Sequence, residues 1–309
     1  KPGVGVVMTE IHTLMVNDVP AFVLGAEDYA PLAALGYDIV EHFDTESLLA
    51  AADRADHVLT WDFETGWYSQ FPKLKTVFTP AAGDDWARSD PSGRVPVSHG
   101  SYHGELMCES VLSAILFMNH RMPQMIRNFA RREWDRTTQG ESRMLSRQSV
   151  LIIGYGHIGK ICAEVLTPHV REVIGVRRRP EQSEEAEIPV YGMSGLVDLL
   201  PLADHVLMLL PGGSDTDQFM NAERLTRMKK GAFIYNFGRG NALTAQDLLP
   251  QLDHLGGAFL DVTEEEPLRQ DSPLWRQDNV FITPHSSAIF EDYRRLFIEE
   301  VCARLGKAG

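Results

Sequence analysis

The stretch SVLIIGYGHIG, residues 149–159, decides the fold class that this chain can adopt. Its first five residues form a continuous apolar run, which is typical of a strand covered on both faces. In the GxGxxG pattern that follows, Gly154 permits a tight turn, Gly156 lets the backbone approach a pyrophosphate, and Gly159 allows close helix–strand packing. A helix that begins here attracts phosphate to its N-terminus. The pattern predicts a dinucleotide-binding unit; a structural glycine turn and a nucleoside-type methyltransferase site are the alternatives.

The end of the next predicted strand indicates which dinucleotide is bound. Residues 172–176 run directly into Arg177-Arg178-Arg179-Pro180, and Arg177 stands 18 positions after Gly159. An NAD site usually has an acidic residue about 20 positions beyond the glycines, and that carboxylate would repel a 2′-phosphate. Guanidinium groups form paired, charge-assisted hydrogen bonds to phosphate, so the sequence favours NADP(H), with NAD(H) as the second cofactor. The alternative is a solvated basic loop balanced by the acidic residues Glu184, Glu185 and Glu187.

Both halves of the chain show a β–α rhythm, which indicates parallel sheets with helical crossovers. In the first half we expect strands at 22–24, 38–40, 57–60 and 75–78, and helices at 28–35 and 45–52, the second capped by Asp44 or Thr45. In the second half we expect strands at 149–153, 172–176, 205–210, 232–236, 257–261 and 280–283, and a helix at 244–252 whose Thr244 and Asp247 match a capping box. The fold class is therefore α/β, with two doubly wound, Rossmann-like or flavodoxin-like domains.

Two further helices are predicted outside this rhythm. Residues 105–119 form a long apolar-periodic helix, too apolar for a free surface, and we expect it to pack between domains or to form a dimer interface. Residues 289–305 form a helical tail that we expect to return to the first unit.

Composition limits the class of protein. The 309 residues are 44% hydrophobic and 23% charged, an ordinary globular mixture, and the formal net charge is −14. That balance argues against a nucleic-acid partner, because phosphate binding needs a basic surface. No apolar run approaches the roughly 20 residues that cross a bilayer, and the first residues lack a signal-peptide core, so we expect a cytoplasmic protein without a membrane partner. Three cysteines far apart and scattered histidines predict neither a disulfide framework nor a metal site.

Three polar segments follow predicted strands of the second half. They are NFGRG at 236–240, with an arginine on a flexible, glycine-flanked loop, DVTEEEP at 261–267, and TPHSSA at 283–288. In isolation the histidine of the last segment reads as a structural group and the glutamate before proline as a loop charge. Together they lie just beyond the carboxyl ends of strands, where open parallel sheets bind ligands. Their joint placement in the sheet that carries GxGxxG therefore favours a functional site.

These motifs, with DSPLW at 271–275, resemble in their order the D-isomer-specific 2-hydroxyacid dehydrogenase family, and the resemblance covers nearly the whole chain. It implies a substrate-binding (catalytic) domain formed by residues 1–100 and 285–309. A dinucleotide-binding Rossmann domain, residues 101–284, would be inserted into it, with the active site in the interdomain cleft.

The resemblance also implies the roles of single residues. Arg239 pairs with the substrate carboxylate and the 2-oxo group, because a guanidinium fork fits a planar 2-oxo acid. His285 is the general acid and base, and Glu266 is the partner that orients its ring and stabilises its protonated form. The amides of Ala82 and Gly83 cradle the substrate carboxylate, and Tyr102 is a pocket aromatic. Asp261 holds the nicotinamide end, within a cofactor-binding set of Gly154, Gly156, His157, Ile158, Gly159, Arg177, Arg178, Leu210, Pro211, Thr216, Phe237, Gly238, Asp261, His285 and Ser287.

The chain departs from the family pattern at two positions. Asp84 stands where an apolar residue is frequent, and a carboxylate there opposes an anionic substrate unless it is paired or turned away. Gly213 stands where a threonine is frequent, which removes one hydroxyl contact to the cofactor, although Thr216 is retained. Neither change touches Arg239, Glu266 or His285, so they concern the substrate and not the reaction.

The sequence thus predicts an NADPH-preferring oxidoreductase that reduces a small 2-oxo acid, such as glyoxylate or hydroxypyruvate, to the D-2-hydroxy acid. As in the family, a homodimer is expected. The alternative is a dinucleotide-sensing regulatory protein of the same fold with little turnover.

Overall fold

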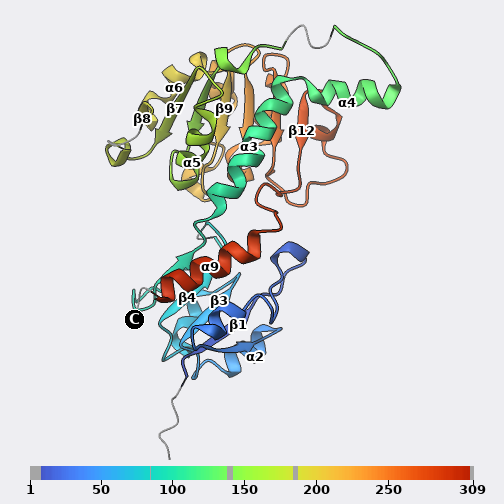
Figure 1. Ribbon diagram of the computed structural model, residues 1–309. Coiled ribbons are helices and arrows are strands. Elements are labelled where there is room, and N and C mark those ends of the chain that lie inside the picture. The colour runs from blue at the N-terminus through green and yellow to red at the C-terminus, as the bar shows by residue number, and fades with distance from the viewer. Residues whose placement is uncertain (1–7, 84, 138–141, 184–186, 307–309) are drawn as a thin grey trace, which may run out of the picture. The chain divides into compact units, whose positions relative to one another are not determined.

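The computed structural model describes residues 8–83, 85–137, 142–183 and 187–306, and the chain forms two compact units (Figure 1). Unit 1 consists of the described residues up to His103 and from Ile289 onward, and unit 2 of those from Gly104 to Ala288. Each unit contains one parallel sheet, so the predicted fold class of two parallel-sheet α/β domains is confirmed. Three residues discussed above lie outside the described residues: Asp84, Glu184 and Glu185.

Unit 1 is built on a five-stranded sheet in the order β2-β1-β3-β4-β5. The strands are β1 Glu10–Leu14, β2 Asp38–Glu41, β3 His57–Thr60, β4 Thr76–Thr79 and β5 Val97–His99. Its helices are α1 Ala30–Ala34, α2 Thr45–Ala50 and α9 Tyr293–Gly306, with 3-10 turns η1 Pro20–Phe22 and η2 Thr65–Gln70. As predicted, the carboxylate of Asp44 caps α2, accepting a hydrogen bond from the Ser47 amide at 2.7 Å. The helical tail α9 contacts α1 and η1 of unit 1.

One prediction for unit 1 is wrong, and strands β1 and β5 were not predicted. No strand forms at 22–24, because Pro20 begins the 3-10 turn η1 and fixes the backbone there. The sequence also missed β1, because its central residue, His12, is polar yet fully buried. Both ring nitrogens of His12 lie 2.9 Å from a partner, Nδ1 from His42 Nε2 and Nε2 from Glu10 Oε2. A buried polar side chain is tolerated when it is hydrogen-bonded, but it interrupts the apolar pattern that predicts a strand.

Unit 2 is built on a seven-stranded sheet in the order β12-β11-β10-β9-β6-β7-β8. The strands are β6 Ser149–Ile153, β7 Glu172–Arg177, β8 Val190–Gly192, β9 His205–Met208, β10 Phe233–Asn236, β11 Gly257–Leu260 and β12 Val280–Ile282. The strand order reverses between β6 and β9. In open α/β sheets, ligands bind at the carboxyl ends of the strands that flank such a switch point.

Helices cover both faces of the unit 2 sheet: α3 His103–Asn119 and α5 His157–Leu166 on one face, and α6 Leu196–Leu199, α7 Ala222–Arg227 and α8 Ala245–Leu248 on the other. A further helix, α4 Met122–Arg131, belongs to neither core cluster. The 3-10 turns are Leu145–Arg147, Pro180–Ser183, Met193–Gly195, Leu200–Leu202, η8 Ser214–Thr216, Gly240–Ala242, Leu249–Gln251 and Pro273–Arg276. Val150 and Ile152 of β6 pack into one core cluster and Leu151 and Ile153 into another, which explains the continuous apolar run.

The long apolar helix buries its stripe against its own sheet. Met107, Val111, Ile115 and Met118 of α3 share one core cluster with α5 and the strands, and Figure 1 shows α3 and α5 on the same face. The predicted helix at 244–252 begins as α8 and continues as a 3-10 turn. The N-cap half of its predicted capping box is confirmed, because the Asp247 amide donates to Thr244 Oγ1 at 3.2 Å, whereas the Asp247 carboxylate accepts the Thr244 hydroxyl at 2.8 Å. Among the described residues, no helix is both long and apolar enough to span a bilayer.

Candidate active site

The glycine loop after β6 has the geometry that the sequence predicts. Gly154 has a φ of 101°, and a Cβ there would lie 2.6 Å from the carbonyl oxygen of Leu209. A Cβ on Gly159 would lie 2.7 Å from the carbonyl oxygen of Gly154, so helix α5 can approach the strand only with glycine at this position. A Cβ on Gly156 would meet no protein atom within 4 Å, and Gly156 is the N-cap of α5. The loop is therefore tightly packed at Gly154 and Gly159 but has free space at Gly156, at the N-terminus of α5. A pyrophosphate fits this position.

The predicted cofactor residues around this loop all lie at the carboxyl ends of strands. His157 and Ile158 are the first residues of α5, and Arg177 and Arg178 end β7 or follow it. Leu210 and Pro211 follow β9, and Phe237 and Gly238 follow β10. Phe237 is buried and stacks on Phe259, whereas Pro211 is exposed. The sheet thus brings residues from four separate segments to the switch point.

The hydroxyl of Thr216 is used by its own loop. Its Oγ1 lies 2.8 Å from the carbonyl oxygens of both Pro211 and Gly213, which share its single proton, and the residue is buried. Gly213 has a φ of 121°, a backbone conformation in which a threonine would be strained. The glycine at this departure from the family pattern therefore fits the backbone of this chain.

The loop that carries Arg239 is held by close packing. A Cβ on Gly240 would lie 1.8 Å from the carbonyl oxygen of Thr263, and one on Gly238 would lie 2.4 Å from that of Leu210. The glycines that flank Arg239 therefore allow neighbouring loops to approach one another, and the expectation of a flexible loop is corrected. Asn236 Nδ2 donates to the carbonyl oxygen of Arg239 at 3.1 Å.

Asn236 is a site residue that the sequence analysis missed. It is 1% exposed, and its Oδ1 accepts the Gly238 amide at 3.2 Å while its Nδ2 holds the Arg239 carbonyl. The signal was present, because asparagine at a strand end commonly hydrogen-bonds the backbone two residues further on. The Arg239 guanidinium donates to the Gly238 carbonyl oxygen at 3.0 Å.

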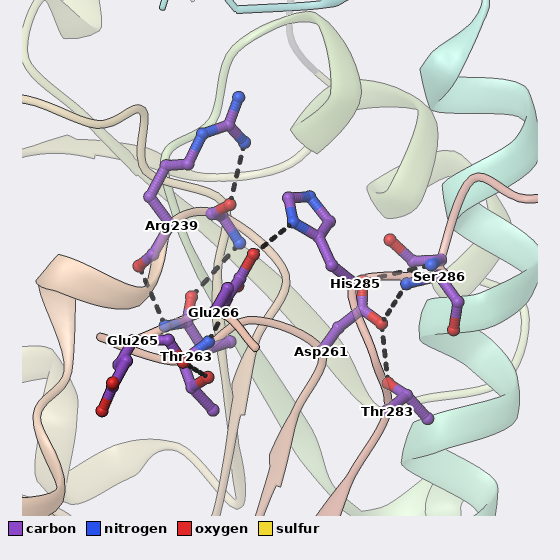
Figure 2. Close-up of polar contacts among 11 residues, drawn as sticks. Arg239, Asp261, Thr263, Glu265, Glu266, Thr283, His285 and Ser286 are labelled. Carbon is purple, nitrogen blue, oxygen red and sulfur yellow. Dashed lines mark hydrogen bonds and ion pairs between the residues drawn. The ribbon is translucent and has the colours of Figure 1, made fainter. Parts of the chain in front are cut away.

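His285 and Glu266 form the predicted pair. His285 Nδ1 lies 2.9 Å from Glu266 Oε2, and the other carboxylate oxygen accepts the Thr263 amide at 3.1 Å (Figure 2). Partial burial opposes ionisation of Glu266, but the hydrogen bond and charge of His285, the Thr263 amide and the charge of Arg239 together lower its pKa. Glu266 is therefore a carboxylate at neutral pH. Both side chains are about half exposed, 47% for His285 and 40% for Glu266, which leaves the imidazole accessible.

Asp261 organises the segment that carries His285. Its buried carboxylate accepts hydrogen bonds from Thr283 Oγ1 at 2.6 Å, the Ser286 amide at 2.9 Å and the Ser287 amide at 3.1 Å (Figure 2). Its carbonyl oxygen accepts the His285 amide at 2.8 Å. These bonds hold His285 at a φ of 49°, a left-handed conformation that is uncommon for residues other than glycine. Asp261 thus positions His285, a function that the sequence analysis did not assign to it.

Arg239, Glu266 and His285 come from the loops after three neighbouring strands, β10, β11 and β12. Figure 2 shows their side chains directed to one side of the sheet edge. The arrangement offers a fixed cation for a carboxylate or a polarised carbonyl. Beside it stands an imidazole, held by a carboxylate, that can move a proton.

Of the predicted substrate-binding residues of unit 1, Ala82 and Gly83 follow β4 and Tyr102 follows β5. Ala82 is exposed and Gly83 partly exposed, and the Ala81 carbonyl oxygen beside them accepts the Gly100 amide at 3.1 Å. Tyr102 is 6% exposed, and its hydroxyl donates to the Pro80 carbonyl oxygen at 3.3 Å. Burial raises the pKa of Tyr102 well above the ordinary value, so the hydroxyl stays protonated.

A cavity of about 470 Å³ opens at the opposite, amino edge of the unit 2 sheet. Phe233, Gly256 and Asn279, which begin or precede β10, β11 and β12, line it, together with Arg121 and Arg127. None of the predicted site residues lines it, so cavity volume does not identify the site. Within the described ranges, no group of three or more histidine, cysteine, aspartate or glutamate side chains is placed to hold a metal ion.

Comparison with known proteins bears directly on this geometry. An uncharacterized protein of the proB 3′ region of Corynebacterium melassecola is 36% identical over 158 residues, so the match spans about half of each protein, 50% of this chain and 52% of that one. The structure of a D-isomer specific 2-hydroxyacid dehydrogenase from Xanthobacter autotrophicus Py2, in complex with NADPH and MES, has a TM-score of 0.79 and 26% identity. It covers 97% of this chain and 95% of its own.

A second solved structure is similarly close. The NADPH-dependent glyoxylate/hydroxypyruvate reductase of Sinorhizobium meliloti, in complex with NADP and sulfate, has a TM-score of 0.77 and 27% identity, covering 97% of this chain and 96% of its own. The family model described as "D-isomer specific 2-hydroxyacid dehydrogenase, NAD binding domain" matches residues 112–287, more than half of the chain. The resemblance drawn from the motifs is confirmed: the chain belongs to the D-isomer specific 2-hydroxyacid dehydrogenase family.

Proposed function

We propose that this chain is an NADPH-preferring oxidoreductase that reduces a small 2-oxo acid of the glyoxylate or hydroxypyruvate type to the D-2-hydroxy acid. The observation that carries the proposal is the His285–Glu266 pair, 2.9 Å apart, beside Arg239 on the edge of the sheet whose switch point bears the glycine loop. The NADPH-dependent glyoxylate/hydroxypyruvate reductase among the similar structures supports the substrate class.

The residues of unit 2 fit a nicotinamide dinucleotide. The open amide side of Gly156 and the N-terminus of α5 would hold the pyrophosphate, and Arg177 and Arg178 would bind the 2′-phosphate. When bound, NADPH supplies the hydride. The NADPH and NADP complexes of two similar structures support this cofactor over NADH.

Residues of the chain itself supply the proton and bind the charged group of the substrate. Arg239 binds the carboxylate and the 2-oxo oxygen, which fixes the plane of the substrate. Because Nδ1 of His285 faces Glu266, Nε2 is the atom that gives a proton to the carbonyl oxygen as the carbonyl carbon accepts hydride. Glu266 stabilises the imidazolium before the transfer, and Asp261 keeps the ring in place through the 283–287 segment.

We assign the two units different parts in this reaction. Residues 1–100 with 285–309 form the substrate-binding domain, and residues 101–284 form the dinucleotide-binding domain, close to the compact units of the structure. The amides of Ala82 and Gly83 would receive the substrate carboxylate. Tyr102 is the least supported member of the site, because its hydroxyl is buried against Pro80.

We also propose that the protein acts in the cytoplasm as a homodimer formed through the segment after α3. The inner stripe of α3 is buried on its own sheet, whereas α4 projects from unit 2 (Figure 1). Phe129 and Trp134 on and after α4 are 86% and 88% exposed, and burying both rings against a second copy would remove their apolar surface from water. Sedimentation of the Phe129→Ser, Trp134→Ser double variant should show a monomer; an unchanged dimer would place the interface elsewhere.

The proposed reaction is tested by NADPH oxidation with glyoxylate, hydroxypyruvate, pyruvate and phenylpyruvate, repeated with NADH. Turnover with NADPH on a small 2-oxo acid is expected, and His285→Gln should reduce it by about 10²- to 10⁴-fold with NADPH affinity retained. NADPH binding without turnover on any of these acids would instead favour a dinucleotide-sensing protein. Equal use of NADH would contradict the assigned cofactor preference.

A further inference from the structure

An ion pair crosses the carboxyl end of the strand that carries the glycine loop. Arg178 follows β7 and Asp215 lies in η8 after β9, and Arg178 Nη1 is 3.3 Å from Asp215 Oδ2. In the sheet, β6 lies between β7 and β9. The pair therefore joins the two loops that flank the Gly154–Gly159 turn, where the dinucleotide is proposed to bind.

The two partners of this pair differ in how firmly they are held. Asp215 belongs to a loop fixed by Thr216 Oγ1, which donates to two loop carbonyl oxygens, and by Asn241 Nδ2, which donates to the Gly213 carbonyl oxygen at 3.2 Å. Arg178 stands on a long side chain that is 72% exposed. The backbone that carries Asp215 is thus held, although its side chain is 78% exposed, and the longer Arg178 side chain is the partner with the wider range of positions.

The chemistry of the two nucleotides sets the outcome of a competition for Arg178. An exposed ion pair is weak, because water screens it and ordering two side chains opposes it. A phosphate takes a guanidinium through paired, charge-assisted hydrogen bonds, which are considerably stronger. The 2′-phosphate of NADPH can therefore displace Asp215 from Arg178, whereas the 2′-hydroxyl of NADH cannot.

We propose that Asp215 is a specificity-determining residue: it holds Arg178 across the glycine loop and releases it only to a 2′-phosphate. This inference rests on the proposed NADPH site and adds the prediction that Asp215 weakens NADPH binding. To bind, the 2′-phosphate of NADPH must break the ion pair and lie near the Asp215 carboxylate, which repels it. NADH binds with the ion pair intact. Asp215 therefore reduces the preference for NADPH that Arg177 and Arg178 create.

The test is the dissociation constant of the full-length chain for NADPH and NADH, measured by nucleotide fluorescence in the wild type, Asp215→Asn, Arg178→Ala and the double variant. Asp215→Asn should tighten NADPH about two- to five-fold, the range expected from freeing one exposed ion pair, and leave NADH within error. The gain should shrink at high salt, because salt screens both the pair and the repulsion. In the Arg178→Ala background, Asp215→Asn should increase the affinity for NADPH only slightly. That small increase does not depend on the ion pair, which is already absent there.

Asp217→Asn provides the matched control, because it removes one negative charge two residues away, from a carboxylate that accepts Asn241 Nδ2 instead of pairing with arginine. It should leave the ratio of the two affinities close to that of the wild type. If Asp215→Asn leaves NADPH binding unchanged or weakens it while Arg178→Ala weakens NADPH, the inference about Asp215 is wrong and the phosphate site stands. If Arg178→Ala itself spares NADPH, the assignment of the 2′-phosphate to Arg178 fails.

Discussion

Replacing Gly240 with alanine tests whether backbone contact between two loops positions the groups proposed to be catalytic. The added Cβ would lie 1.8 Å from the carbonyl oxygen of Thr263 and 2.6 Å from the amide of Glu264. Ordinary contact begins near 3.4 Å, so the loops must separate by about 3.4 − 1.8 = 1.6 Å. Both obstructing atoms are backbone, so no side-chain rotation relieves the clash.

Separating the two loops would displace groups on both of them, Arg239 on one and Glu266 on the other. Gly240 adjoins Arg239, and the Thr263 amide donates to Glu266, the partner of His285. A misplacement of about 1 Å can reduce turnover about 10²-fold, so Gly240→Ala should lower kcat/KM for the 2-oxo acid by about that factor. The free energy of unfolding should fall by about 1–3 kcal/mol, as for other overpacked sites.

Gly195→Ala is the control for the loss of glycine itself. Its Cβ would meet only the Cβ of Tyr191, at 3.9 Å, and its φ of −85° suits alanine. Its kcat/KM should equal that of the wild type, and its unfolding free energy should rise by about 0.4–1 kcal/mol. Steady-state kinetics and urea denaturation of both variants decide the matter. If Gly240→Ala behaves like Gly195→Ala in both assays, the reasoning from loop contact is refuted.

Three further predictions concern single side chains. Glu266→Gln keeps an acceptor for the Thr263 amide but removes the charge beside His285. Because the imidazolium then lacks its carboxylate partner, kcat should fall about 10- to 100-fold without a change in NADPH affinity. A wild-type kcat would contradict the role of the carboxylate. Asn236→Asp turns a buried donor toward the Arg239 carbonyl oxygen into an acceptor, so KM for the 2-oxo acid should rise at least about 10-fold; an unchanged KM would show that Asn236 does not position Arg239. Burial lowers the pKa of His205 to about 4, so below about pH 6.5 the unfolded chain binds a proton that the folded chain refuses. Stability should fall by up to about 3 kcal/mol as the pH drops from 6.5 towards 4, measured by urea denaturation, and His205→Gln should flatten this slope; an equal slope in the variant would count against His205.

Local sequence patterns predicted most of the unit 2 sheet and proposed the site residues that the structure places at its carboxyl edge. The strand–glycine–helix turn at 149–159, the capping box at Thr244 and the order of the motifs each depend on residues near one another in the chain. In unit 1 the same approach failed at β1, because the hydrogen bonds that make a buried His12 acceptable come from residues that include His42, 30 positions away.

The sequence by itself determined the family and the parallel α/β architecture, and it predicted the set Arg239, Glu266 and His285, because each rests on a short pattern of residue types. Only the tertiary structure decided what the individual atoms do. It showed that Gly240 serves loop contact, that Asp261 holds the His285 segment, and that Arg178 meets Asp215. These relations join residues 23 to 37 positions apart, and a local pattern does not encode which distant partners a sheet brings to the same edge.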